Sequence, residues 1–244
     1  MAAPPEKVIG VLGGMGPEAT VSFYAKLVAH TPAARDQDHL RVVIDSNPKV
    51  PDRTAALLGQ GPSPVPAMVA GLEALARAGA DFVVIPCVSA HAFLDDLRAQ
   101  TRLPVLSMLD AVADHLRTHH PHLRTIGLLA TSGTVAAGRF QDVLARSGIR
   151  TLVPDAEGQA RVMASIHAIK GSAAGPERAR IGEDLRAMGE GLVAAGAQGV
   201  VLGCTEVPLV LSAGSLSVPV FDAVLILARA AITAAGREPA PEAA

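Results

Sequence analysis

The chain has 244 residues, a length that allows one large domain or two of modest size. Half of the residues are hydrophobic but only 2% are aromatic, so Ala, Val and Leu must fill the core. The net charge of −2 gives no basic surface for nucleic acid, and no apolar run approaches the ~18 residues that a membrane helix needs.

The cysteines and the N-terminus predict the compartment. Two cysteines in so long a chain do not make a disulfide framework. Residues 1–7 lead directly into an apolar strand and do not resemble a signal peptide. We therefore expect a protein of the reducing cytoplasm.

The first half reads as alternating strands and helices. Apolar runs predict buried parallel strands at Val8–Leu12, Arg41–Ser46, Phe82–Pro86 and Val105–Leu106. Helices are expected at about 17–30 and 67–78, after His91 and from Asp110. The segment Asn47–Thr54, after the second strand, is expected to be a polar loop.

The second half repeats this alternation. Strands are predicted at Thr125–Ala130 and Thr151–Val153, before Cys204 and around Val220. One helix is expected from the Thr131–Thr134 turn to about Arg146, and a second ends at Lys170–Ser172. A long helix is expected over Glu177–Ala195, interrupted at Gly189 and Gly191, and a last one over Asp222–Ala235. The last helix could cross back onto the first half, so we predict one domain from 1–111 plus 222–244 and a second from 112–221.

An internal repeat links the two halves. Ala78–Cys87 and Ala195–Cys204 share the same residue at six of ten positions, at an offset of 117 residues. The same offset relates Ile9–Leu12 to Ile126–Leu129, Gly16 to Gly133 and Arg53 to Lys170. Ligands bind at the carboxyl ends of strands in parallel sheets. The repeat therefore predicts two pseudo-symmetric α/β halves with parallel sheets and an active site in the cleft between them, to which each half contributes one thiol and one cation.

Two thiols that face one cleft could form a disulfide, bind zinc, or act as acid and base. Zinc requires about four ligands, and only His91 lies near a cysteine in sequence. A redox pair is disfavoured because the chain lacks Cys-X-X-Cys. Acid–base chemistry fits best: one thiolate removes a proton from a stereocentre, and a thiol on the opposite face supplies another, without a cofactor. A free thiol, with a pKa of ~8.5, is already partly ionised near neutral pH.

Cations and hydroxyls accompany the thiols. The correspondence of Arg53 and Lys170 favours the cleft over a solvated surface. The turn at Thr131–Thr134 offers amides and hydroxyls to a carboxylate, although helix capping alone would also explain it. Ser89 and Thr205 follow the cysteines closely and could cap helices or hold ligand.

A dinucleotide site is a weak alternative. The segment Gly14–Ala19 matches Gly-X-Gly-X-X-Ala, but Pro17 removes one of the amides that a pyrophosphate would use. We expect neither a nicotinamide nor a flavin cofactor.

Several short motifs together resemble one family. They are Ile9–Pro17 with Ala19 and Thr20, Asp36–His39, Pro51–Thr54, Pro86–Cys87 with Ala90 and His91, and Gly203–Glu206. In this combination the chain resembles the aspartate/glutamate racemase family, and its aspartate racemase branch in particular. Glu206 after Cys-Thr favours that branch, since glutamate racemases typically have His there.

The resemblance implies two Rossmann-like halves and a cofactor-free mechanism with Cys87 and Cys204 as the acid–base groups. It implies that Arg53 and Lys170 select a side-chain carboxylate, while the Thr131–Thr134 turn and residues beside both cysteines hold the α-carboxylate and amine. The implied substrate-binding residues are Met15, Arg53, Ser89, Thr131, Ser132, Thr134, Lys170 and Thr205. Many members of the family are dimers, so a homodimer is expected, with a small amino acid as substrate and neither nucleic acid nor membrane as partner.

One position departs from the family pattern. The family usually has Asn after the first cysteine, where this chain has Val88. We expect Val88, next to a strand-end cysteine, to face the cleft, so that aspartate binds weakly and Val88→Asn raises aspartate racemisation. The alternative is that Val88 faces the core, where the same change would destabilise the fold. We predict a cofactor-independent racemase of aspartate first and glutamate second. The alternatives are an epimerase or isomerase of another small carboxylate or amino acid, and a non-catalytic amino-acid-binding relative.

Overall fold

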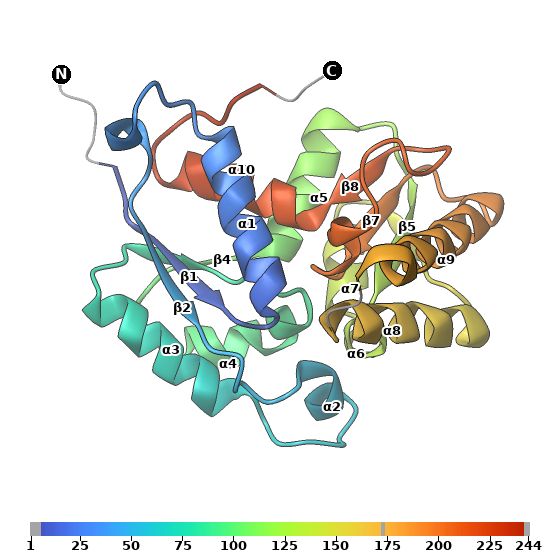
Figure 1. Ribbon diagram of the computed structural model, residues 1–244, viewed down its shortest axis with the longest axis horizontal. Coiled ribbons are helices and arrows are strands. Elements are labelled where there is room, and N and C mark those ends of the chain that lie inside the picture. Colours follow the sequence, from blue (N-terminus) through green and yellow to red (C-terminus); the bar gives the residue numbers. More distant parts are fainter. Residues whose placement is uncertain (1–5, 172–173, 242–244) are drawn as a thin grey trace.

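The structure, a computed structural model, describes residues 6–171 and 174–241. Residues 1–5, which belong to the segment expected not to be a signal peptide, and Ser172, the expected end of one helix, lie outside these ranges. The described chain forms two α/β halves side by side (Figure 1).

Each half is built on a four-stranded parallel sheet. The first sheet has the order β2-β1-β3-β4 and the second the order β6-β5-β7-β8. Their bounds are β1 Ile9–Gly13, β2 Val42–Ser46, β3 Phe82–Val84, β4 Val105–Leu106, β5 Thr125–Ala130, β6 Arg150–Leu152, β7 Val200–Gly203 and β8 Val220–Asp222. The expected fold class, with two parallel sheets of the same topology, is confirmed.

Ten α-helices cover these sheets in the described ranges. They are α1 Pro17–His30, α2 Arg53–Leu57, α3 Val65–Arg77, α4 Leu94–Arg98, α5 Met108–His119, α6 Ser132–Ala137, α7 Arg139–Arg146, α8 Ala156–Lys170, α9 Gly175–Ala194 and α10 Ala223–Ala234. Three short 3-10 turns accompany them, at Asp36–Asp38, Ser89–Phe93 and Val207–Leu209. No helix in the described ranges has both the length and the apolar character needed to cross a membrane.

Three expectations about helices were wrong. The expected loop over Asn47–Thr54 ends in α2, because the Asp52 side chain accepts a hydrogen bond from Ala55 N at 2.7 Å and caps it. Gly138, with φ of 69°, separates α6 from α7. The helix α9 continues through Gly189, where a Cβ atom would lie only 2.7 Å from Leu216 Cδ1, so this glycine serves packing and not a break.

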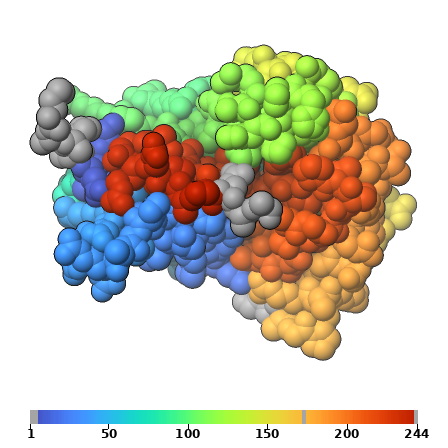
Figure 2. Space-filling model, turned by 90° about the horizontal axis from the view of Figure 1, so that it is seen from above, coloured from blue at the N-terminus to red at the C-terminus, as the bar shows by residue number. Residues whose placement is uncertain are grey.

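The last helix joins the halves. α10 packs on α1 and α5 and also contacts β7 and β8. In Figure 2 the red surface of α10 and the following residues lies between blue and green surfaces of the first half. One hydrophobic cluster accordingly contains Ile9, Ile126 and Phe221, together with Leu227 of α10. The division of the chain at residues 111 and 222 remains a prediction.

Candidate active site

Both thiols lie at the carboxyl ends of central strands. Cys204 follows β7 directly and Cys87 lies three residues after the end of β3. Both are free thiols and are only 4% (Cys87) and 5% (Cys204) exposed. The loops after β1 and β5 start from the neighbouring strands of the same sheets, so each half presents a cysteine and a glycine-containing loop at one sheet edge.

Cys204 is bound to a buried carboxylate. Its Sγ donates a hydrogen bond to Glu206 Oε2 at 2.9 Å, and Thr205 Oγ1 donates to the same oxygen at 3.3 Å. Burial raises the pKa of the Cys204 thiol well above its usual value, and the negative charge of Glu206 raises it further, against the opposing charge of Lys170. Cys204 is therefore a protonated thiol at neutral pH.

Lys170 completes this cluster from the end of α8. Its Nζ lies 3.8 Å from Glu206 Oε1, an oxygen that is buried and has no hydrogen-bond partner among the described residues. Burial acts to lower the pKa of Lys170, but Glu206 and, to smaller extents, Cys204 and Cys87 raise it, so that the net shift is upward. Lys170 thus stays charged within the electrostatic reach of both thiols.

Arg53, at the start of α2, is held by the main chain. Its guanidinium donates to the carbonyl oxygens of Val50 at 3.2 Å, Pro51 at 3.0 Å and Met15 at 3.2 Å. Arg53 is 7% exposed, and its buried Nε has no hydrogen-bond partner among the described residues. The contact with Met15 fixes the loop after β1 against α2.

A cavity of about 560 Å³ brings the two cations together. Arg53 enters its wall from the first half, and Lys170 and Glu206 enter it from the second. Neither cysteine lines the cavity, but Cys204 is hydrogen-bonded to Glu206, which does line it. The remaining lining residues are Gly14, Gly16, Pro17, Glu18, Pro48, Val50, Asp52 and Ile169.

Two repeat-related glycines let the halves approach each other. A Cβ on Gly16 of the first half would lie 3.2 Å from Glu206 Oε1 of the second. A Cβ on Gly133 of the second half would lie 2.8 Å from Thr54 Cα of the first. The repeat predicted the correspondence of these glycines, and the structure shows that both lie where the two halves meet.

The segment after Cys87 is fixed by a buried histidine. Met108 N donates to His91 Nε2 at 3.0 Å, so the proton of the neutral ring belongs on Nδ1, which lies 2.9 Å from Cys87 O. Burial lowers the pKa of His91 to about 4, against the raising effect of the bond to Cys87. Ser89 Oγ lies 3.5 Å from Cys87 Sγ. His91 thus contacts the backbone that carries the thiol.

The turn before α6 makes mainly internal contacts. Thr131 Oγ1 accepts from Thr134 N at 3.1 Å and lies 2.9 Å from Thr134 Oγ1, so this pair caps the helix. Ser132 Oγ accepts a hydrogen bond from Gln159 Nε2 at 3.3 Å. Capping, the simpler of the two expectations for this turn, accounts for both threonines.

Val88 does not open onto the cavity. It is 4% exposed and belongs to the central hydrophobic cluster, in which Met108 also lies. The expectation that Val88 faces the cleft was wrong, because the chain turns into the 3-10 segment directly after Cys87 and directs this side chain into the core.

Sequence reasoning missed the role of Glu206 and misjudged how the cations correspond. Glu206 was noted as a feature of one branch but was not placed in the site; its position two residues after a strand-end cysteine was the available signal. Arg53 begins α2 whereas Lys170 ends α8, so their equivalence under the 117 offset does not extend to equivalent helix positions.

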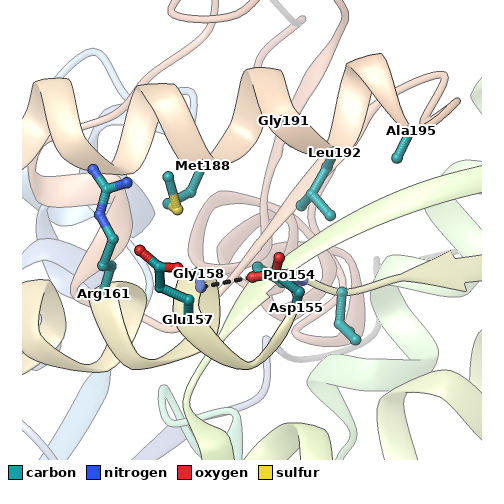
Figure 3. A pocket seen from close by; sticks show the side chains of 10 residues that line it. Pro154, Asp155, Glu157, Gly158, Arg161, Met188, Gly191, Leu192 and Ala195 are labelled. Carbon is teal, nitrogen blue, oxygen red and sulfur yellow. Dashed lines mark hydrogen bonds between the residues drawn. The ribbon is translucent and has the colours of Figure 1, made fainter.

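A second cavity lies apart from these residues, between α8 and α9 (Figure 3). Its volume is about 480 Å³, and none of the predicted site residues lines it. Asp155 in its wall caps α8 through Gly158 N, and Arg161 pairs with Asp184 at 3.1 Å. Within the described ranges, no group of three or more His, Cys, Asp or Glu side chains is placed to hold a metal ion.

The fold and site together define an α/β protein with one buried thiol after a central strand of each parallel sheet and a cavity lined by both halves. The chain belongs to the Asp/Glu/hydantoin racemase family, whose model matches residues 12–231. It is thus an isomerase of the amino-acid racemase class.

Solved structures and a curated relative agree with this assignment. The chain is 33% identical to Picrophilus torridus aspartate racemase, with a TM-score of 0.85 and 96% of each chain covered. An aspartate racemase homologue from Pyrococcus horikoshii is 26% identical, with a TM-score of 0.74, over 95% of this chain and 100% of that one. The broad specificity amino-acid racemase RacX of Bacillus subtilis is 25% identical over 232 residues, 93% of this chain and 97% of the relative.

Proposed function

We propose that the protein is a cofactor-independent racemase of an acidic amino acid, aspartate first and glutamate second, with Cys87 and Cys204 as its acid–base pair. The observation that carries the proposal is the repeat-related placement of one buried thiol at the edge of each sheet, with Cys204 held protonated beside Glu206. The reducing cytoplasm that we propose for the protein would keep both thiols free.

The proposed reaction moves one proton on each face of the α-carbon. The thiolate of Cys87 takes the α-proton, and the electron pair of the C–H bond passes to the α-carbon and its carboxylate. The thiol of Cys204 delivers its proton to the opposite face, which inverts the centre. The thiolate left on Cys204 lies beside the carboxylate of Glu206 and is disfavoured, which favours reprotonation of Cys204 before the next turnover.

The cavity supports an acidic substrate. Arg53 and Lys170 enter it from opposite halves, so a substrate that bridges the cleft reaches a cation on each side. The likeness to an aspartate racemase over nearly the whole chain favours aspartate. The other predicted binding residues, Met15, Ser89, Thr131, Ser132, Thr134 and Thr205, are proposed to hold the α-carboxylate and amine through loops beside the thiols.

A broader amino-acid racemase is the second candidate. Lys170 is already paired with Glu206, and three of the Arg53 hydrogen bonds go to backbone carbonyls. The side-chain carboxylate of a substrate would therefore be stabilised less by each of these cations than by a cation without such partners. The likeness to the broad specificity racemase RacX agrees with this alternative.

The test is a screen of amino-acid enantiomers in D2O, with and without added pyridoxal phosphate. We expect inversion with deuterium incorporated at the α-carbon of aspartate in the absence of the cofactor. Cys87→Ser and Cys204→Ser should each abolish inversion, because the hydroxyl, with a much higher pKa than a thiol, is a poor replacement both for the base and for the proton donor. An unchanged melting temperature would show that both variants fold. Near-normal inversion by either folded variant would rule out the two-thiol mechanism.

A further inference from the structure

The two carboxylate oxygens of Glu206 have different surroundings. The residue is 3% exposed. Oε2 accepts hydrogen bonds from the Cys204 thiol at 2.9 Å and from Thr205 Oγ1 at 3.3 Å. Oε1 is buried and accepts no hydrogen bond from the described residues. A buried carboxylate oxygen is costly unless a donor reaches it, so Oε1 is an acceptor that a ligand can use.

This oxygen belongs to a side chain in the wall of the 560 Å³ cavity. Lys170 Nζ lies 3.8 Å from Oε1, which makes an ion pair but exceeds the roughly 3.2 Å limit of an N–H···O hydrogen bond. From the first half, Gly16 faces Oε1, and a Cβ at that position would lie only 3.2 Å from it. Because Gly16 has no side chain, Oε1 stays uncovered on the side of the first half.

The cavity has two other carboxylates, and both are already engaged at its rim. The Glu18 side chain is 50% exposed and pairs with Arg178 at 2.8 Å. Asp52 is exposed and caps α2 by accepting a hydrogen bond from Ala55 N at 2.7 Å. Among the described acidic residues that line this cavity, Glu206 is therefore the one that is buried and keeps an oxygen without a hydrogen-bonded donor.

We propose that Glu206 Oε1 accepts a hydrogen bond from the α-ammonium group of the substrate and thereby selects amino acids over carboxylates that lack the amine. This inference rests on the proposed function, which supplies the class of ligand. The charges are complementary, since the two carboxylates of aspartate meet Arg53 and Lys170 while its single ammonium group meets Glu206. Hydrogen bonds between two charged groups are the strong ones, so this contact contributes much of the selectivity.

The same contact links substrate binding to the thiol. The negative charge of Glu206 is, after burial, the main cause of the raised pKa of Cys204. An ammonium group at Oε1 offsets part of that charge, so Cys204 releases its proton more readily when an amino acid is bound. The group that distinguishes an amino acid from other carboxylates thus also prepares the proposed proton donor.

The test compares the binding of aspartate with that of succinate, which is aspartate without its ammonium group. Calorimetry on the wild type should show aspartate bound about tenfold to a hundredfold more tightly, the effect of one charge-assisted hydrogen bond. Glu206→Gln should lose most of this preference. Its affinity for succinate should rise, because a buried negative charge beside the dianion is removed. Partial unfolding would weaken both ligands, and a preference that survives in Glu206→Gln overturns the inference.

Two further variants show which group causes the effect. Glu18→Gln removes a carboxylate from the same cavity and should keep the preference; its loss there, and not in Glu206→Gln, would place the ammonium group at the rim. Gly16→Ala keeps every charge but sets a methyl group 3.2 Å from Oε1. The backbone there, with φ of −102° and ψ of 173°, is accessible to alanine. This variant should bind aspartate more weakly and succinate nearly as the wild type does; equal effects on both ligands would contradict the contact.

A second ligand pair separates this inference from the proposed function. Alanine and propionate differ by the same ammonium group and lack a second carboxylate. A preference for alanine over propionate that Glu206→Gln abolishes, without one for aspartate over succinate, would exclude an acidic substrate and retain the contact. Intact preferences without inversion in D2O would exclude the racemase reaction alone. If the wild type prefers the amine in neither pair, the role of Glu206 Oε1 is wrong.

Discussion

At the scale of single residues, Cys204 is a buried thiol whose pKa is raised. Burial and Glu206 together hold its pKa high, while Lys170 opposes them. Glu206 also forms an ion pair with Lys170, with 3.8 Å between Glu206 Oε1 and Lys170 Nζ. One carboxylate therefore acts on both the thiol and the cation, and a change at this residue should alter acid–base behaviour more than it alters the fold.

We predict that Glu206→Gln lowers the pKa of Cys204, because an amide is isosteric but uncharged. The Cys87→Ser background leaves Cys204 as the single thiol, so its rate of alkylation against pH reports its ionisation directly. Each unit by which the pKa falls raises the thiolate fraction at neutral pH about tenfold. Glu183→Gln, an exposed change on α9, is the control. An unchanged alkylation profile in Glu206→Gln would contradict the role of the carboxylate.

A second residue-scale prediction concerns His91, whose folded pKa of about 4 lies below the 6.5 of an unperturbed histidine. As the pH falls, His91 takes up a proton in the unfolded chain at a higher pH than in the folded protein. The stability that the neutral, buried His91 contributes is therefore complete above pH 6.5 and is lost as the pH falls toward 4. The loss should be about 3 kcal/mol in the free energy of unfolding. Urea titrations at pH 7 and pH 4.5 measure it, and His91→Gln should show a flatter dependence over that range. Parallel pH curves for the two proteins would exclude His91 as the cause.

At the scale of elements, the contact between α2 and α6 depends on Gly133. Gly133→Ala should destabilise the protein by about 1–3 kcal/mol, as overpacking does, because the added Cβ would lie 2.8 Å from the Thr54 backbone. Racemisation should fall as well, since the contact lies where the halves meet. Alanine has a higher helix propensity than glycine, so a loss of stability in Gly133→Ala would come from the crowded contact and not from helix propensity.

Gly191→Ala is the matched control for this contact. It lies in α9, and a Cβ there would meet no heavy atom within 4 Å among the described residues. Alanine should therefore stabilise the helix by about 0.5–1 kcal/mol. Thermal unfolding of both variants measures the difference, and equal effects would contradict a specific contact at Gly133.

At the scale of the whole molecule, the cleft collects charges that lie far apart in sequence. Arg53 and Lys170 come from different halves, and Arg178 of the second half pairs with Glu18 of the first at 2.8 Å, beside the same cavity. The cavity therefore lies where ionic contacts join the two halves.

We predict that Lys170→Met lowers kcat/KM for acidic amino acids by about tenfold to a hundredfold, the effect of one charge-assisted hydrogen bond. Neutral amino acids should be affected less. Lys49→Met, which removes an exposed lysine next to two cavity-lining residues, controls for general electrostatic attraction. If Lys170→Met slows every substrate equally, the lysine serves the thiols through Glu206 and does not select the substrate.

The sequence alone determined the strands, most helices and the pair of thiols. Buried strands and amphipathic helices leave local periodic patterns, and the repeat predicted that Cys87 and Cys204 follow corresponding strands; in the structure Cys204 follows β7 directly and Cys87 lies three residues after β3. Membership in the family followed from short motifs that run along the whole chain.

Only the tertiary structure decided which groups meet. The hydrogen bonds of Arg53 to main-chain carbonyls, the pairing of Glu206 with Lys170 and the burial of Val88 depend on how loops end and how the halves pack. The bond from Arg53 to Met15 O joins groups 38 positions apart, and Lys170 and Glu206 are separated by 206 − 170 = 36 positions, so no local residue period encodes these contacts. The repeat could equate Arg53 with Lys170 by number, but their places at opposite ends of two helices were set by loop lengths and packing.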